Sequence, residues 1–98
     1  MKRPESRAKE AAETLAIQAL AFIAEEPDRL ATFLGATGLS PDSIRESANQ
    51  PHFLLGVLEH MLSNESLLVA FADSAGINPA DIARARSAMG SHWERDLP

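Results

Sequence analysis

The sequence contains no cysteine. Disulfide bonds, thiolate nucleophiles and cysteine metal ligands are therefore excluded, and the chain suits a reducing compartment. β-Branched residues are scarce as well, because Val, Ile and Thr total ten of the 98 residues, against 17 Ala and 12 Leu. Since Ala and Leu favour helices and β-branched residues favour strands, this composition indicates an all-α fold.

Long hydrophobic runs are also missing. No stretch approaches the roughly 18 uncharged apolar residues of a membrane-spanning helix. Acidic residues (Glu5, Glu10 and Glu13) interrupt the start of the chain, where a signal peptide would need an apolar run. We therefore expect a cytoplasmic protein with no membrane contact. The 27 large apolar side chains suffice for one compact core.

Positive charge is concentrated at the start of the chain. Residues 1–9 carry four basic residues and one acid, whereas residues 10–98 carry five Arg and 13 acidic residues. An acidic body disfavours binding to nucleic acid. We divide the chain into a basic N-terminal arm with the start of the first helix (residues 1–12), a helical domain (13–90) and a C-terminal tail (91–98).

One sequence pattern occurs twice, 38 positions apart. It reads Gly-x-Ser/Asn-Pro-x-x-Ile, and its members are Gly38, Ser40, Pro41 and Ile44, then Gly76, Asn78, Pro79 and Ile82. The Gly can adopt the left-handed conformation that ends a helix. The Ser or Asn can cap the next helix, whose first position suits Pro because that N–H needs no partner. We predict a helix–turn–helix connection at each copy.

Two explanations of this repeat are open. Residues 13–50 align with residues 51–88, so the chain could contain two copies of an ancient three-helix unit. Alternatively, any helix–turn–helix connection draws on the same few residue types. Either way we expect a compact single-domain bundle of about six helices.

Apolar spacing and helix start and stop residues predict where the helices lie. The first expected helix begins between Pro4 and Ser6 and ends at Glu25. The other five cover about residues 27–37, 41–49, 51–63, 65–75 and 79–89, and Gly90 ends the last of them. The second half of the first helix is apolar on most sides, so we expect it to be central, with the charged first turns projecting outward. Glu26 is a candidate cap for the second helix. Gly56 lies within a helix, and we expect it to mark the close approach of a neighbouring backbone.

His60 is the strongest candidate for a catalytic or metal-binding residue, because it lies in an apolar helix beside Glu59. A general base or metal ligand fits this placement, and so does a histidine at the edge of the core. His52 lies eight residues earlier, so the i, i+4 spacing of a zinc helix is absent. We predict no catalytic, metal-binding or cofactor-binding residue, and no enzyme.

Two further residues are candidates for contact with a partner. Arg45 lies in a segment, residues 39–50, that could form part of a helix-turn-helix, although Glu46 beside it opposes this interpretation. Trp93 either folds back onto the bundle or forms an exposed anchor for a partner. The basic N-terminal arm could contact phosphate or remain a solvated terminus.

The sequence as a whole resembles a family of small uncharacterised alphaproteobacterial proteins, classified as a domain of unknown function. The resemblance covers about residues 13–90 and rests on Ala19, Leu20, Phe22, Ile23, Ala24, Pro27, Arg29, Leu30, Phe33, Leu34, Thr37, Gly38, Leu39, Ser40, Pro41, Arg45, Pro51, Phe53, Leu54, Val57, Leu58, His60, Leu67, Leu68, Ala70, Phe71 and Ala72. It implies an all-helical fold and a bacterial cytoplasmic setting, and it implies no activity.

The function expected from these observations is that of a non-enzymatic protein–protein interaction module, either an adaptor or a homodimer. The alternative is a DNA- or RNA-associated regulator that uses residues 39–50 and the basic arm. A third hypothesis is a small-ligand carrier with a pocket between the first and fourth helices near His60.

Overall fold

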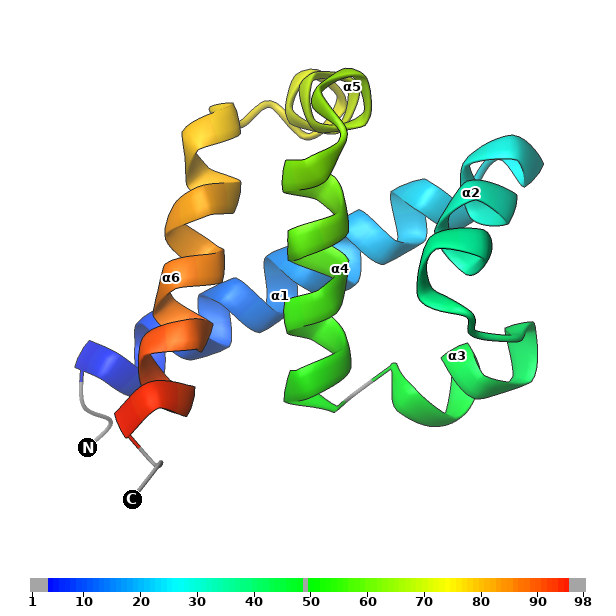
Figure 1. Cartoon of the computed structure of the whole chain (residues 1–98). Coiled ribbons are helices and arrows are strands. Elements are labelled where there is room, and N and C mark those ends of the chain that lie inside the picture. Colours follow the sequence, from blue (N-terminus) through cyan, green and yellow to red (C-terminus); the bar gives the residue numbers. More distant parts are fainter. Residues whose placement is uncertain (1–3, 49, 96–98) are drawn as a thin grey trace.

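The computed structural model describes the backbone of residues 4–48 and 50–95 and the side chains of residues 7–48 and 50–89. Within these ranges it contains six α-helices and no strand (Figure 1), which confirms the predicted all-α fold. The helices are α1 (Pro4–Ala24), α2 (Pro27–Thr37), α3 (Pro41–Ser47), α4 (Pro51–Ser63), α5 (Glu65–Ala75) and α6 (Pro79–Arg95).

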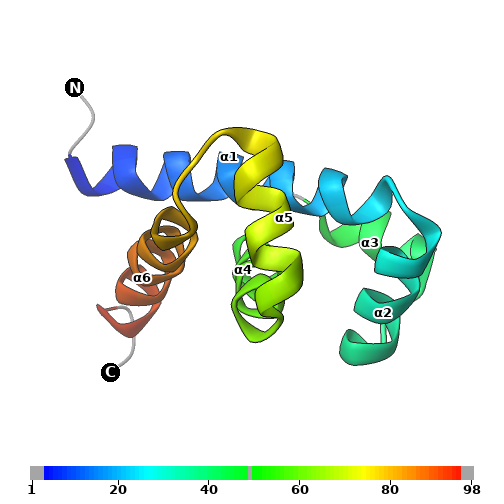
Figure 2. The same ribbon diagram turned by 90° about the horizontal axis from the view of Figure 1, so that it is seen from above.

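Helices α1, α4 and α6 form the centre of the bundle. α1 packs against both α4 and α6, and these two also pack against each other. In Figure 2, α1 runs along one side of the molecule and α2, α4 and α6 lie on its other side. α5 follows α4 after a sharp bend, whereas α3 lies at the edge beside α2 and makes few contacts with other helices.

Small side chains of α1 meet larger side chains of its neighbours in the core. α1 contributes Ala12, Ala16 and Ala19, none more than 2 % exposed. Because alanine has a short side chain, the α1 backbone can lie close to its neighbours. The core is completed by Ile23, Phe33, Leu54, Val57, Leu58, Met61, Leu67, Phe71, Ile82, Ala85 and Met89.

The first glycine of the repeated pattern ends α2. Gly38 has a φ of 74°, and its N–H donates to the Leu34 carbonyl at 2.8 Å, which is the simple left-handed end of a helix. Ser40 then caps α3, since its Oγ accepts from the Ser43 N–H at 3.2 Å, and Pro41 takes the first helical position.

The second glycine ends α5 with a different set of hydrogen bonds. Gly76 has a φ of 69° and donates to the Asp73 carbonyl at 3.3 Å, while the Ile77 N–H donates to the Ala72 carbonyl at 2.9 Å. These two bonds form a Schellman motif. The two hinges therefore share a glycine conformation and differ in the hydrogen bonds that satisfy the end of the helix.

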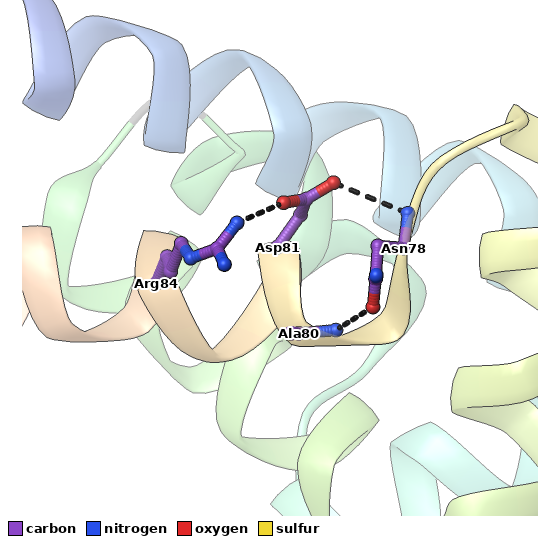
Figure 3. A network of polar contacts seen from close by, with 4 residues as sticks. All are labelled: Asn78, Ala80, Asp81 and Arg84. Carbon is purple, nitrogen blue, oxygen red and sulfur yellow. Dashed lines mark hydrogen bonds and ion pairs between the residues drawn. The ribbon is translucent and has the colours of Figure 1, made fainter.

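A network of polar contacts caps α6 (Figure 3). Asn78 Oδ1 accepts from the Ala80 N–H at 2.9 Å, and Asp81 Oδ2 accepts from the Asn78 N–H at 3.1 Å. This reciprocal pair resembles a capping box, with Asp in place of Glu or Gln. Asp81 Oδ1 also accepts from Arg84 Nη1 at 2.9 Å.

One predicted helix end and one candidate cap are wrong. α6 continues through Gly90 to Arg95, because a helical Gly costs only about 1 kcal/mol and no proline follows within the helix. Residues 91–95 of the predicted tail are therefore helical. Glu26 precedes α2, but its side chain makes no capping hydrogen bond and its Oε1 lies 3.7 Å from Arg29 Nη2. Asn49, the expected end of the third helix, lies outside the described residues.

The prediction that Gly56 marks a close backbone approach is also wrong. A Cβ on Gly56 would meet no heavy atom within 4 Å. The residue instead borders a groove of about 280 Å³ between α2, the end of α3 and α4, where Phe33, Leu39 and Phe53 form part of the wall. The absent side chain contributes to this open space.

Candidate functional site

The side of α1 that faces away from the bundle forms an exposed, mostly uncharged surface. No charged residue lies between Glu13 and Glu25, and Figure 2 shows α2, α4 and α6 on the opposite side of this helix. We call this surface the outer α1 face. It comprises the exposed residues Arg7, Glu10, Thr14, Ile17, Gln18, Ala21, Ala24 and Glu25.

Ile17 lies near the middle of the outer α1 face and is 44 % exposed. Among the residues whose side chains are described, only Val69 of α5 is another exposed large hydrophobic residue, at 51 %. A single exposed hydrophobic residue is common in soluble proteins. Ile17 differs in having Ala21 and Ala24 beside it on the same helix side, so a partner could bury a continuous apolar strip.

Opposite charges lie toward the two ends of the outer α1 face. Arg7 and Glu25 are both exposed, and among the described residues neither has an ion-pair partner. They are separated by about five helical turns, so they lie on the same side of the helix. Each charge is therefore available to a partner.

His60 lies in a cleft of about 340 Å³ between α2, α4 and α5, and not between the first and fourth helices as predicted. Its ring meets the Phe33 ring edge-on, with the ring centroids 5.1 Å apart. Its Nε2 is buried without a hydrogen-bond partner. The cleft is lined by Asp28, Arg29, Thr32, His60, Asn64, Ser66, Leu67 and Ala70.

Three of the polar side chains that line this cleft, those of Arg29, Thr32 and Asn64, have hydrogen-bond partners within the chain. The Arg29 guanidinium lies 4.0 Å from the centre of the Phe22 ring and donates to the Phe22 carbonyl at 3.4 Å. The Thr32 hydroxyl donates to the Asp28 carbonyl at 3.0 Å. Burial lowers the pKa of His60 below its ordinary value of 6.5, so the imidazole is neutral at pH 7. The arrangement is that of a histidine at the edge of the core.

The other two candidate contact residues lie apart from His60 in the sequence and on other helices. Arg45 is exposed in the last turn of α3 and has no ion-pair partner among the described residues. Trp93 belongs to α6 by its backbone, but its side chain lies outside the described residues. Its predicted contact, either with the bundle or with a partner, therefore stays a prediction.

Groups of three or more His, Asp or Glu side chains that could hold a metal ion do not occur among the described residues. The same part of the chain has no single helix that is long and apolar enough to cross a membrane. Only α4 and α5 taken together reach that length and composition, and they are bent by 108° relative to each other.

These features define a small all-α domain, with six helices in the described residues and a mostly uncharged side of α1 left exposed. The chain belongs to the family described as Protein of unknown function (DUF3572), whose model matches residues 9–92. This match confirms the resemblance to a domain of unknown function. Neither the curated proteins nor the solved structures include a match to this chain.

Proposed function

We propose that this protein is a non-enzymatic protein–protein interaction module and that its outer α1 face is the contact surface. The observation that carries the proposal is the 44 % exposure of Ile17 within a helix segment that has no charge between Glu13 and Glu25. Fully burying an Ile side chain stabilises a complex by up to about 1.5–3 kcal/mol. Part of that stabilisation is unused in the free chain.

The packing of the other apolar helix supports the choice of α1. The widest apolar stripe of the sequence lies on α4, and its central residues Leu54, Val57, Leu58 and Met61 are at most 1 % exposed. α4 therefore satisfies its apolar side within the chain. α1 does so on one side only, which leaves the outer α1 face for a partner.

Photo-crosslinking in the host cell tests this proposal. A photoreactive amino acid replaces Ile17 in one variant and Val69 in the control, because these two residues have similar size and exposure on different helices. We expect a covalent adduct from position 17 and none from position 69. No adduct from position 17, or equal adducts from both positions, contradicts the proposal.

A DNA- or RNA-associated regulator is the second candidate function. It is supported by the short link between α2 and α3 and by the exposed Arg45, which has no ion-pair partner among the described residues. Against it, α3 has seven residues and carries Asp42 and Glu46 as well, so little positive charge would face phosphate. A gel shift at low salt that Arg45→Ala abolishes would favour this function over the first.

We further propose a bacterial, cytoplasmic setting. The support is the sequence resemblance, the absence of Cys, which suits a reducing compartment, and the absence of a single spanning helix among the described residues. Fractionation of the host cell followed by immunoblotting tests it, since recovery in the membrane or periplasmic fraction would contradict it.

A further inference from the structure

We propose that the partner of the outer α1 face is a second copy of this chain, packed antiparallel with α1 against α1. This inference rests on the proposed function and adds the identity and orientation of the partner. It is carried by the opposite charges of Arg7 and Glu25 at the two ends of the face, with Glu10 one turn inward of Arg7, and by the uncharged residues 14–24 between Glu13 and Glu25.

The positions of the charges select the antiparallel orientation. Arg7 and Glu25 lie on the same side of α1, about five turns or roughly 27 Å apart. A two-fold axis near the middle of the helix brings Arg7 of each copy next to Glu25 of the other. A parallel pair would instead bring the two Glu25 side chains together at one end, which is unfavourable. At its other end the two Arg7 side chains would meet, with only the Glu10 side chains one turn away to offset their repulsion.

The middle of the face suits the same axis. The midpoint between Arg7 and Glu25 falls at residue 16, adjacent to Ile17 along the helix. The two Ile17 side chains would therefore meet close to the axis, where each loses its contact with water. The short side chains of Ala21 and Ala24, both exposed, allow the roughly 8–10 Å spacing of closely packed helices.

The size of the face sets the expected affinity. The face is roughly 27 Å long and about as wide as one helix, 10–12 Å. Each copy would therefore bury about 300 Å², well below the roughly 800 Å² per partner of a stable complex. We expect a monomer–dimer equilibrium with a dissociation constant on the order of 100 µM, and the affinity should weaken further as salt screens the end charges.

Sedimentation equilibrium of the full chain tests the inference, over about 10 to 500 µM protein at low salt. We expect reversible dimerisation. Arg7→Glu and Glu25→Arg should each weaken it roughly tenfold, because each replaces two attractions by two repulsions. The chain with both substitutions restores both pairs with exchanged signs, so its affinity should return to within about threefold of the original.

A matched pair of variants, with circular dichroism to show that each is folded, tests whether the outer α1 face forms the dimer contact. Ile17→Gln should weaken the dimer and Val69→Gln should not, and circular dichroism confirms that each variant is folded. A chain that stays monomeric over the whole range overturns the inference. A dimer that neither charge reversal affects, or that the double variant does not restore, overturns the antiparallel arrangement.

The crosslink from position 17 separates this inference from the proposed function. An adduct of twice the 10.6 kDa of the chain supports both. An adduct of another mass, with a monomeric chain in sedimentation, overturns self-association and leaves the interaction module standing. The absence of any adduct, with a monomeric chain, overturns both.

Discussion

Gly56 makes α4 less stable than Ala would at the same position, and no close contact requires a glycine there. It lies within α4, and a Cβ there would meet no heavy atom within 4 Å. Because Ala loses less backbone freedom on folding, Gly56→Ala should raise the free energy of unfolding by about 0.5–1 kcal/mol. Urea denaturation at equilibrium measures the change.

The matched control is the same substitution at a glycine with a left-handed backbone. Gly76 has a φ of 69°, so Gly76→Ala should lower the free energy of unfolding by about 1–2 kcal/mol. If both variants lose stability, a side chain at position 56 meets neighbours and the space beside α4 is not open. If Gly56→Ala is stabilising, the groove beside it is the remaining explanation for a glycine at this position.

His60 should make stability depend on pH. Burial lowers its pKa in the folded chain below the ordinary value of 6.5. Between the two pKa values the unfolded chain binds more protons, so stability is full above pH 6.5 and falls as the pH drops through the folded pKa. Asp28 and Arg29 line the same cleft.

Comparison with a variant isolates this contribution from the titration of carboxylates. The loss of unfolding free energy between about pH 7.5 and pH 5 should be smaller in His60→Gln than in the original chain. Urea midpoints at the two pH values measure it. Equal losses in the two chains would show that His60 is not desolvated.

At the scale of elements, the two repeated hinges each place a capping residue before a helix, but the two helices pack to different extents. Asn78 begins α6, which packs on α1 and α4, whereas Ser40 begins α3, which makes few contacts. Asn78→Ala should therefore lower the global free energy of unfolding by about 1 kcal/mol. Ser40→Ala should change global stability little and should instead speed amide hydrogen exchange within α3, because a peripheral helix can open locally.

Urea denaturation and hydrogen exchange on the two cap variants distinguish these outcomes. Equal global losses from both substitutions would mean that α3 unfolds only together with the whole domain. That result would contradict the peripheral place of α3 and would support the interpretation of two equivalent three-helix units.

The starts of the helices could be predicted from the sequence, because proline fixes its own backbone angle and suits the first helical position. Pro27, Pro41, Pro51 and Pro79 each begin a helix. Gly90 could not be interpreted in this way, since glycine tolerates both helical and left-handed angles. Whether a glycine ends a helix depends on the residues after it and on the packing of the helix.

At the scale of the whole molecule, the candidate site could be predicted only in part. The sequence shows that the second half of α1 is apolar on most sides, but an amphipathic pattern that would orient the helix is missing between Glu13 and Glu25. The placement of α4 and α6 decides which side is covered. Ala12, Ala16 and Ala19 are buried and Ile17 is exposed, the reverse of their order of hydrophobicity. Tertiary packing favours the short side chains here because they let the helices approach.

This orientation of α1 predicts that an Ala→Leu substitution has different effects on stability on the two sides of the helix. Ala16 is fully buried and Ala21 is exposed. Ala16→Leu inserts extra carbon atoms between packed helices and should lower the free energy of unfolding by about 1–3 kcal/mol. Ala21→Leu adds the same atoms in open solvent, so its effect should stay within about 0.5 kcal/mol.

Both variants are measured by urea denaturation at low micromolar concentration, where self-association contributes little to stability. Leu and Ala have similar helix propensities, so a difference between the variants reports packing alone. A comparable loss from Ala21→Leu would mean that the outer α1 face is covered within the monomer. The surface on which both the interaction module and the antiparallel dimer depend would then be absent, and both proposals would fail together.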